Sequence, residues 1–316
     1  MIIPNPVMHE KFYSPWCLGA PLYMPAHRHD LIEIANGEKN QQLRSMIFCT
    51  EDAVAHTELE SSLRHLGLCL QGFRSHSPRF RYIRARNPEV LARLLDLPHI
   101  EKIDGFVLPK FNLQVFDAYF DQLKNTGFKV MPTLETREVF DHSAMIELRA
   151  ALLDQQIYQQ IAMLRIGGND LMNILGIRRP RHLTVYDTPL GHLIAQLVTI
   201  FKPYGFALSA PVFEFLAEER LLLKEIQLDL AHGLIGKTAI HPSQIPIIEG
   251  HYSVAMDDFE MAESLLQQDV PAIFKMHDTM CEVATHRNWA ENIRHRHQCY
   301  GLQETPQVNS YAEFSF

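Results

Sequence analysis

The sequence lacks the features that mark several common classes of protein. It has five cysteines in 316 residues, and no two of them form a CxxC pair. Cysteines this scattered indicate neither a disulfide framework nor a structural zinc site, and they favour a reducing compartment. No GxGxxG fingerprint is present, so a nicotinamide cofactor is not expected. Gly236-Lys237-Thr238 resembles the end of a phosphate loop, but the first glycine of that motif is missing.

Long apolar runs and excess positive charge are also absent. No stretch approaches the roughly 18 to 20 uncharged residues that a membrane helix needs, and the N-terminus lacks the layout of a signal peptide. We therefore expect a cytoplasmic protein that does not enter a membrane. The formal net charge of -8 opposes nucleic-acid binding, although the basic cluster at 178–181 could meet an anionic small molecule.

Short apolar runs alternate with longer amphipathic segments along most of the chain. This rhythm predicts an α/β fold, and eight strands with intervening helices favour a closed (β/α)₈ TIM barrel. The expected strands are 19–24, 45–50, 80–85, 104–109, 128–133, 162–167, 206–211 and 235–240. The expected helices are 30–43, 57–71, 88–97, 112–126, 138–155, 188–203, 214–231 and 254–267.

The barrel should be complete near residue 250. We therefore predict a barrel domain at 1–250 and a C-terminal helical extension with a tail at 251–316. No Gly/Ser-rich or Pro-rich linker divides the chain, so the extension is expected to be an appendage of one domain.

Polar side chains follow the expected strands. In a barrel of parallel strands, the residues at the C-terminal strand ends converge on one mouth, where active sites are built. The candidates, in chain order, are His27, Arg28, Glu51, Asp52, Arg84, Lys110, Glu135, Asn169, Asp170 and His241. Such a ring of carboxylates and cations predicts a ligand site at that mouth.

Glu135 and Asp170 are the natural metal ligands of this set. Two carboxylates facing one cavity repel each other unless a cation lies between them, and Mg²⁺ takes one or two carboxylates while leaving room for substrate oxygens. An ion bound there would chelate a keto acid and stabilise the enolate that forms when a carbon–carbon bond breaks. Gly168 and Asn169, in the segment that carries Asp170, allow the backbone to approach the ligand closely.

The cations have competing interpretations. Arg28 and Arg84 suit bidentate capture of a substrate carboxylate, but each could instead form a surface or inter-helix ion pair. Lys110 could form a Schiff base, although a nearby metal site favours an electrostatic or structural role. His241 precedes Pro242 and is best explained as a turn residue. Asp52, His27 and His241 remain open as general bases.

Seven short motifs resemble those of a known family, in the same order and at similar spacing. They are LYMPAHR (22–28), FCTEDAV (48–54), IR (83–84), FVLPK (106–110), PTLET (132–136), GGNDL (167–171) and GKTAIHPSQIPII (236–248). Together they resemble the citrate lyase β-subunit branch of the HpcH/HpaI aldolase family over roughly residues 20 to 250. The last motif is the most specific.

The resemblance implies a (β/α)₈ barrel with Mg²⁺ on Glu135 and Asp170, and with Arg28 and Arg84 holding an acid substrate. Glu51 would be a supporting acid, beside Asp52 and Lys110 as further catalytic candidates. Members of the family cleave or form bonds in citryl, malyl or similar thioesters and commonly form trimers or hexamers. The expected partners are therefore a keto or hydroxy acid, or its coenzyme A thioester, and further copies of this chain.

The chain also departs from the family pattern. Cys49 and Thr50 replace the first Asp and the Leu of the DLED motif, and Arg137 replaces the alanine after IET. These changes leave the expected metal ligands in place but alter the surroundings in which a thioester would bind. The altered DLED segment keeps open a binding or assembly protein that has lost turnover. A malate-synthase-like condensation also stays open, because the sequence does not separate cleavage from the reverse reaction.

Overall fold

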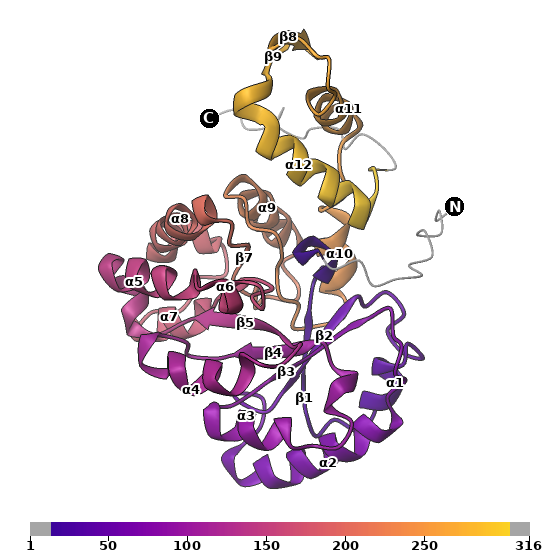
Figure 1. Cartoon of the computed structure of the whole chain (residues 1–316), viewed down its shortest axis with the longest axis vertical. Coiled ribbons are helices and arrows are strands. Elements are labelled where there is room, and N and C mark those ends of the chain that lie inside the picture. Colours follow the sequence, from indigo (N-terminus) through magenta and orange to yellow (C-terminus); the bar gives the residue numbers. More distant parts are fainter. Residues whose placement is uncertain (1–13, 304–316) are drawn as a thin grey trace. The chain divides into compact units, whose positions relative to one another are not determined.

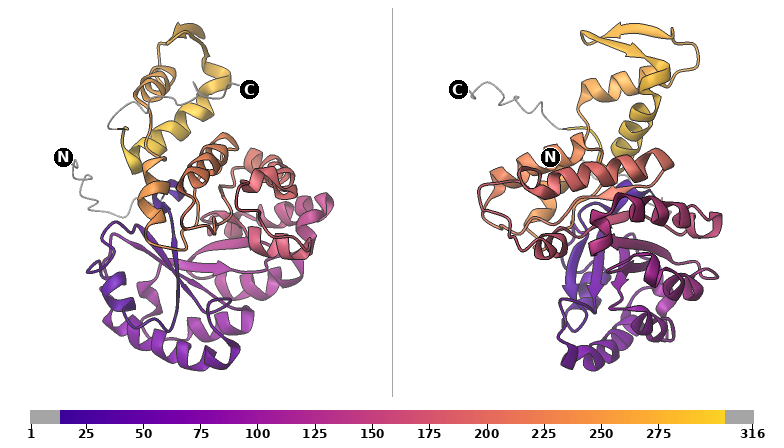
Figure 2. Two further views of the ribbon diagram at one scale, coloured as in Figure 1. Left: turned by 180° about the vertical axis from the view of Figure 1, so that it is seen from behind. Right: turned by 90° about the vertical axis from the view of Figure 1, so that its left-hand side faces the viewer.

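The computed structural model describes residues 14–303, which divide into two compact units between Ile248 and Glu249. In the first unit, seven parallel strands pair in chain order, each with the next. Figure 1 shows these strands at the centre of the unit with helices around them, and Figure 2 shows the same arrangement from two further sides. The strands are β1 (Leu22–Pro25), β2 (Ser45–Cys49), β3 (Phe80–Arg84), β4 (Gly105–Leu108), β5 (Lys129–Leu134), β6 (Leu164–Ile166) and β7 (Leu208–Ser209).

The expected eighth strand at 235–240 is not a regular strand, yet its residues occupy the eighth position. Lys237 forms a parallel bridge with Ala210 beyond β7, and Ala239 forms one with Leu22 of β1. The Tyr23 amide donates to the Ala239 carbonyl at 3.3 Å. The segment thus joins the last strand to the first with isolated bridges, because residues 235–237 pair with β7 and Ala239 pairs with β1.

Among the described residues of the first unit, ten α-helices accompany the strands. Their apolar faces are buried, as in α2, where Leu59, Leu63, Leu66 and Leu70 recur at three- and four-residue spacing. They are α1 (Leu31–Ala35), α2 (Leu59–Gly72), α3 (Pro88–Leu95), α4 (Leu113–Leu123), α5 (His142–Leu152), α6 (Gln155–Tyr158), α7 (Gly168–Ile174), α8 (Pro189–Phe201), α9 (Glu219–Ala231) and α10 (Gln244–Gly250).

Some helix predictions were wrong in length. The helix expected at 30–43 stops at Ala35, because Asn36-Gly37 follows and Gly37 adopts a φ of 87° that a helix cannot continue. The helix expected at 138–155 begins with a 3₁₀ turn and is regular only as α5. The short helices α7 and α10 were not expected, since seven residues give too little periodicity to recognise.

The second unit was expected to contain helices, but it also holds a hairpin. Strands β8 (Ile273–Met276) and β9 (Thr279–Glu282) pair antiparallel between helices α11 (Met256–Leu265) and α12 (Val283–Tyr300). His277 and Asp278 form its two-residue turn with φ values of 46° and 57°. Turns of this type favour Asn-Gly or Asp-Gly, so His-Asp gave no hairpin signal in the sequence.

Apolar side chains between residues 254 and 293 form a small core within the second unit. It contains Val254, Ala262, Leu265, Cys281, Ala290 and Ile293. In the part of the chain from 14 to 303, no helix combines the length and apolarity needed to cross a membrane.

A fully buried ion network holds α9 against the end of the sheet. The Lys237 ammonium donates to Glu225 at 2.8 Å, to Asp229 at 3.0 Å and to the Pro211 carbonyl at 2.9 Å. Burial opposes the charge of Lys237, but Asp229 and Glu225 raise its pKa. Tyr186 donates to Asp229 at 2.7 Å. The lysine of the GKT segment therefore has a structural role, which agrees with the rejection of a phosphate loop.

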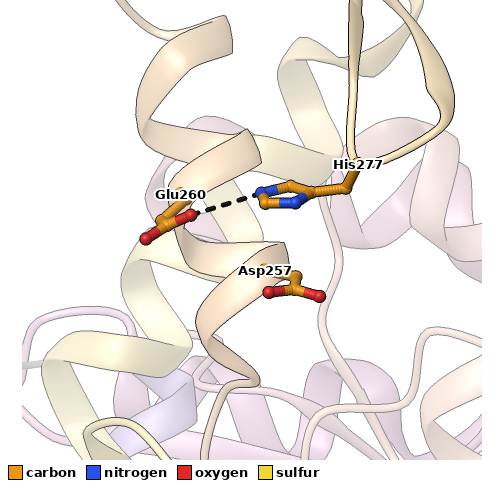
Figure 3. Close-up of side chains that lie close together, drawn as sticks. All are labelled: Asp257, Glu260 and His277. Atoms are coloured by element: carbon orange, nitrogen blue, oxygen red, sulfur yellow. Dashed lines mark ion pairs between the residues drawn. The ribbon is translucent and has the colours of Figure 1, made fainter.

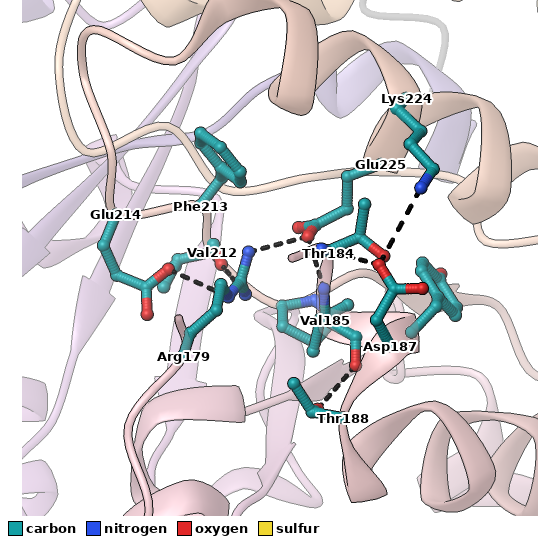
Figure 4. A network of polar contacts seen from close by, with 12 residues as sticks. Arg179, Thr184, Val185, Asp187, Thr188, Val212, Phe213, Glu214, Lys224 and Glu225 are labelled. Atoms are coloured by element: carbon teal, nitrogen blue, oxygen red, sulfur yellow. Dashed lines mark hydrogen bonds and ion pairs between the residues drawn. The ribbon is translucent and has the colours of Figure 1, made fainter. Parts of the chain in front are cut away.

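Arg179 completes this network (Figure 4). Its guanidinium donates to Glu225 at 2.7 Å, pairs with Glu214 at 3.2 Å and donates to the Val212 carbonyl at 3.0 Å. The middle of the basic cluster at 178–181 is therefore committed to the fold and is not available to an anionic ligand. Arg181, in contrast, is exposed.

Candidate active site

Arg84 is the centre of a polar cluster at the C-terminal ends of the strands. It is the last residue of β3 and is buried, and its guanidinium pairs with Glu51 at 2.8 Å, Asp52 at 3.2 Å and Glu135 at 3.1 Å. Burial opposes its charge, but the surrounding Tyr23, Glu135 and Glu51 raise its pKa above the ordinary value. Arg84 thus lies among the acids, as its position at a strand end predicted. Its guanidinium already forms ion pairs with three carboxylates.

Lys110 joins the same cluster through its backbone and its side chain. Its amide donates to Glu135 at 2.8 Å, and its ammonium donates to Glu51 and lies 3.8 Å from Asp170. Its φ of 50° falls in the left-handed region, which costs a non-glycine residue free energy and is typical of functional positions. The half-exposed ammonium is therefore a cation held among carboxylates.

Glu135 is the most buried carboxylate of the cluster, with 4% of its surface exposed. Burial raises its pKa to about 7; Arg84 opposes this rise, whereas the Asp170 charge adds to it. A carboxyl group in this state binds a proton or a cation near neutral pH. The expected repulsion between Glu135 and Asp170 is therefore present in the structure, and it is the condition that a metal ion relieves.

Glu51 and Asp52 have pKa values shifted in opposite directions. Burial and the neighbouring Asp52 raise the pKa of Glu51, despite its contacts with Arg84 and Lys110. For Asp52, burial acts upward, but the hydrogen bond from Glu51 and the charges of Arg84 and Lys110 lower the pKa. Two adjacent carboxyls with divergent pKa values are suited to holding one proton and one charge.

The glycines of the GGND segment make room for the acids. A Cβ on Gly167 would lie 2.2 Å from Glu135 Oε2, and a Cβ on Gly168 would lie 2.7 Å from Pro211 Cβ. Both positions therefore exclude any side chain while the cluster stays as it is. Asn169 is exposed and Asp170 is partly exposed, as expected for residues that reach toward a ligand.

Three predicted candidates lie apart from this cluster. Arg28 follows β1 as expected, but it pairs with Asp30 and is largely exposed. The imidazole of His27 lies 3.4 Å from the Ser62 hydroxyl. His241 accepts a hydrogen bond from the Ser243 amide at 3.2 Å, which fits the turn role expected of it. Within the described part of the chain, none of these three side chains forms a hydrogen bond or ion pair with the acids of the cluster.

Arg86 is a residue that the sequence did not reveal. Its guanidinium donates to the carbonyls of Thr50 at 3.1 Å and Glu51 at 3.0 Å, and also to Val54. It therefore fixes the loop that carries Glu51 and Asp52. Its neighbour Asn87 caps α3 by accepting from the Val90 amide at 2.9 Å. The only sequence signal was proximity to the third strand.

The donor set fits a magnesium ion. The carboxylate oxygens of Glu135 and Asp170 are hard ligands. Burial, together with the Asp170 charge, raises the pKa of Glu135, which favours a proton or a cation at this position. Two protein carboxylates leave the remaining coordination positions for water and substrate, which is the usual arrangement for this ion.

A second group of possible ligands lies in the other unit (Figure 3). Of the residues from 14 to 303, Asp257, Glu260 and His277 are the three acid or imidazole side chains whose donor atoms lie within 4.8 Å of one another. His277 Nε2 lies 3.2 Å from Glu260 Oε2. All three side chains are on the surface, and nothing else at this position indicates a ligand.

The fold and the site define a parallel α/β barrel whose C-terminal strand ends carry several carboxylates together with the cations Arg84 and Lys110. Residues 13–302 match the family described as C–C bond lyase of the TIM-barrel fold. The chain therefore belongs to this family, which confirms the predicted barrel and the resemblance to the citrate lyase β-subunit-like branch of the HpcH/HpaI aldolases.

Individual relatives are more distant. A (3S)-malyl-CoA thioesterase of Cereibacter sphaeroides is 26% identical over 248 residues, which cover 76% of this chain and 79% of that protein. The structure of CitE from Mycobacterium tuberculosis, in complex with magnesium, acetoacetate and coenzyme A, superposes with a TM-score of 0.66 at 19% identity, covering 89% of this chain and 98% of that one. Malate synthase of Haloferax volcanii gives a TM-score of 0.60 at 14% identity, covering 72% of each chain.

Proposed function

We propose that the protein is a magnesium-dependent carbon–carbon bond lyase that cleaves a hydroxy-dicarboxylate or its acyl-CoA thioester. The observation that carries the proposal is the buried Glu135, whose raised pKa, proximity to Asp170 and contact with Arg84 suit a cation and an acid substrate at one point. When bound there, magnesium would supply the positive charge that stabilises an enolate. The solved CitE complexes with magnesium support the choice of ion.

The protein side chains then have separate tasks. Glu135 and Asp170 hold the ion, and Arg84 with Lys110 balances the negative charge of the acids and substrate. Cleavage requires a base that takes the proton of the substrate hydroxyl while the bonding electron pair moves to the departing enolate, which is later protonated. Asp52 is our choice of base, because its lowered pKa keeps it ionised and its side chain is exposed to the mouth. Arg28, Gly168 and Asn169 remain proposed substrate contacts, because they follow β1 and β6 at the C-terminal ends of the strands.

A second function has a specific observation in its favour. The curated relatives at 25–26% identity are named thioesterases, which would hydrolyse the thioester and leave the carbon chain intact. The experiment is to incubate the protein with malyl-CoA and Mg²⁺ and to measure both the keto acid and the free thiol. Keto acid without thiol supports the lyase, and thiol without keto acid supports the thioesterase. Metal-dependent binding without either product would leave a binding or assembly protein.

Running the assay in reverse tests the condensation alternative. Acetyl-CoA and glyoxylate should join only slowly if cleavage is the main activity, whereas fast condensation with thiol release would favour a malate-synthase-like enzyme. The trimer or hexamer implied by the family also remains a proposal, which sedimentation equilibrium measures directly.

Metal affinity should depend on pH through Glu135. Its pKa of about 7 means that Mg²⁺ must displace a proton below neutrality, so affinity should fall by about tenfold for each pH unit below 7 and level off above it. Because the folded pKa lies above the usual carboxyl value, the free energy of unfolding without metal should decrease as pH rises toward 7. Thermal unfolding with and without Mg²⁺ across this range measures both effects, and a metal affinity independent of pH would contradict them.

A further inference from the structure

Arg165 is a buried cation without an acidic partner among the described residues. It lies in β6, 4% of its surface is exposed, and its side chain contacts Thr238 Oγ1 and, at 3.7 Å, Met131 Sδ. No carboxylate of residues 14–303 lies within ion-pairing distance of it. Burying a guanidinium is costly unless an anion compensates it, because guanidinium groups in proteins keep their proton.

Arg165 lies directly beside the candidate active site. Its Cζ is 5.4 Å from the centre of the Tyr23 ring, and the Cζ of Arg84 is 5.8 Å from the same ring. Two residues beyond Arg165 comes Gly167, which packs against Glu135. Arg165 therefore lies in the barrel interior, one layer of side chains below Glu135. The Tyr23 ring is next to the guanidinium groups of both Arg165 and Arg84.

The neighbours of Arg165 in the sheet also have unused hydrogen-bonding capacity. Thr133 of β5 and Ser209 of β7 pair with it in register on its two sides, and in-register residues of parallel strands point to the same face. Both side chains are buried, and neither hydroxyl has a hydrogen-bond partner within residues 14–303; the same is true of Arg84 Nε. Buried polar atoms are nearly always paired, so a ligand or water is expected among these donors.

We propose that Arg165, with the hydroxyls of Thr133 and Ser209, binds a carboxylate of the substrate at the floor of the site. The inference rests on the proposed function, because it takes a dicarboxylate substrate as given and specifies which residues bind its second carboxylate. The metal ligands at the mouth select a keto acid, and the floor selects those with a second carboxylate. The site thus prefers dicarboxylates to monocarboxylates.

The test compares two keto acids that differ in the second carboxylate. Freshly dissolved oxaloacetate and pyruvate are titrated calorimetrically, each with saturating Mg²⁺, into wild type, Arg165→Gln and Ser209→Ala. Arg165→Gln should weaken oxaloacetate binding by about 10- to 100-fold, as expected for a charge-assisted hydrogen bond, and change pyruvate binding by less than about threefold. Ser209→Ala removes one neutral donor with little risk to folding and should lower the same preference by about fivefold.

Arg149→Gln is the matched control. Arg149 lies on α5, and its Cζ is 3.8 Å from the centre of the Tyr204 ring. This substitution should leave the preference for oxaloacetate over pyruvate unchanged. Equal weakening of both acids in Arg165→Gln, together with an unchanged preference in Ser209→Ala, would assign Arg165 a structural role and overturn the inference. Wild-type protein that binds neither acid would overturn the proposed function, and this inference with it. Pyruvate binding without any gain for oxaloacetate would overturn the inference alone.

Discussion

Glu135→Gln is expected to lower the affinity for a divalent ion by about 100-fold or more. The amide keeps the shape of the side chain but removes the charge, and even partners outside a metal's own ligands typically change affinity by about 10- to 100-fold. The variant would also lose the titration near pH 7, so the remaining weak binding should no longer depend on pH in that range. Manganese binding, followed by electron paramagnetic resonance, measures both effects because the ion substitutes for magnesium at oxygen ligands.

The matched control is Glu147→Gln on the exposed face of α5, which carries the same chemical change away from the site. It should bind manganese as the wild type does. Thermal unfolding of Glu135→Gln without metal should show little loss of stability, or a gain, because a buried charge is removed. Unchanged manganese affinity in a folded Glu135→Gln protein would show that the ion, if it binds, binds elsewhere.

Lys237→Met should cost about 3–5 kcal/mol in the free energy of unfolding, the usual consequence of removing one member of a buried ion pair. The substitution preserves the length and apolar volume of the side chain. However, it leaves Glu225 and Asp229 buried without the ammonium that donates hydrogen bonds to both of them. Burial and the neighbouring Glu225 already raise the pKa of Asp229. Without Lys237, Asp229 should become protonated more readily, so the variant should be less destabilised at acidic pH. Urea-induced unfolding at two pH values measures this.

Lys224→Met is the control for the loss of a lysine charge on the same helix. Its ammonium is mostly exposed and lies 3.9 Å from Asp187, so the change should cost only about 0–1 kcal/mol. A second variant, Lys237→Met with Asp229→Asn, should recover part of the lost stability because one uncompensated carboxylate is removed. If Lys237→Met were no more destabilising than Lys224→Met, the network would not be a main support of the barrel.

The sequence predicted the residues of the polar cluster because strand ends are visible in a pattern, whereas their role as metal ligands stays a prediction. Glu135 and Asp170 follow short apolar runs, and the mouth of a parallel barrel collects such residues whatever the packing of the core. Arg84 and Lys110 were found in the same way, and the structure brings all four together with Glu51 and Asp52. Arg28 obeys the same pattern but pairs with Asp30, two residues away, which strand-end position alone cannot foresee.

The burial and the partners of Arg165 and Lys237 could not be predicted from the sequence. Both lie inside expected strands, where a charged residue is normally assumed to face solvent. In a closed barrel one side of each strand faces the interior and the other faces the surrounding helices, so neither side is open to water. Arg165 points inward beside Tyr23, and Lys237 points outward to α9. Identifying their partners required the register of neighbouring strands and the position of α9.

The most direct test of the central claim is calorimetric titration of Mg²⁺ together with oxaloacetate or pyruvate into the wild type and into Asp170→Asn. Asp170 is the partly exposed member of the expected metal pair, so its amide variant should fold normally while losing the second carboxylate ligand. We expect keto-acid binding that requires Mg²⁺ in the wild type and disappears in the variant. Equal, metal-independent binding in both proteins, or binding in neither, would contradict a magnesium-dependent keto-acid site on Glu135 and Asp170.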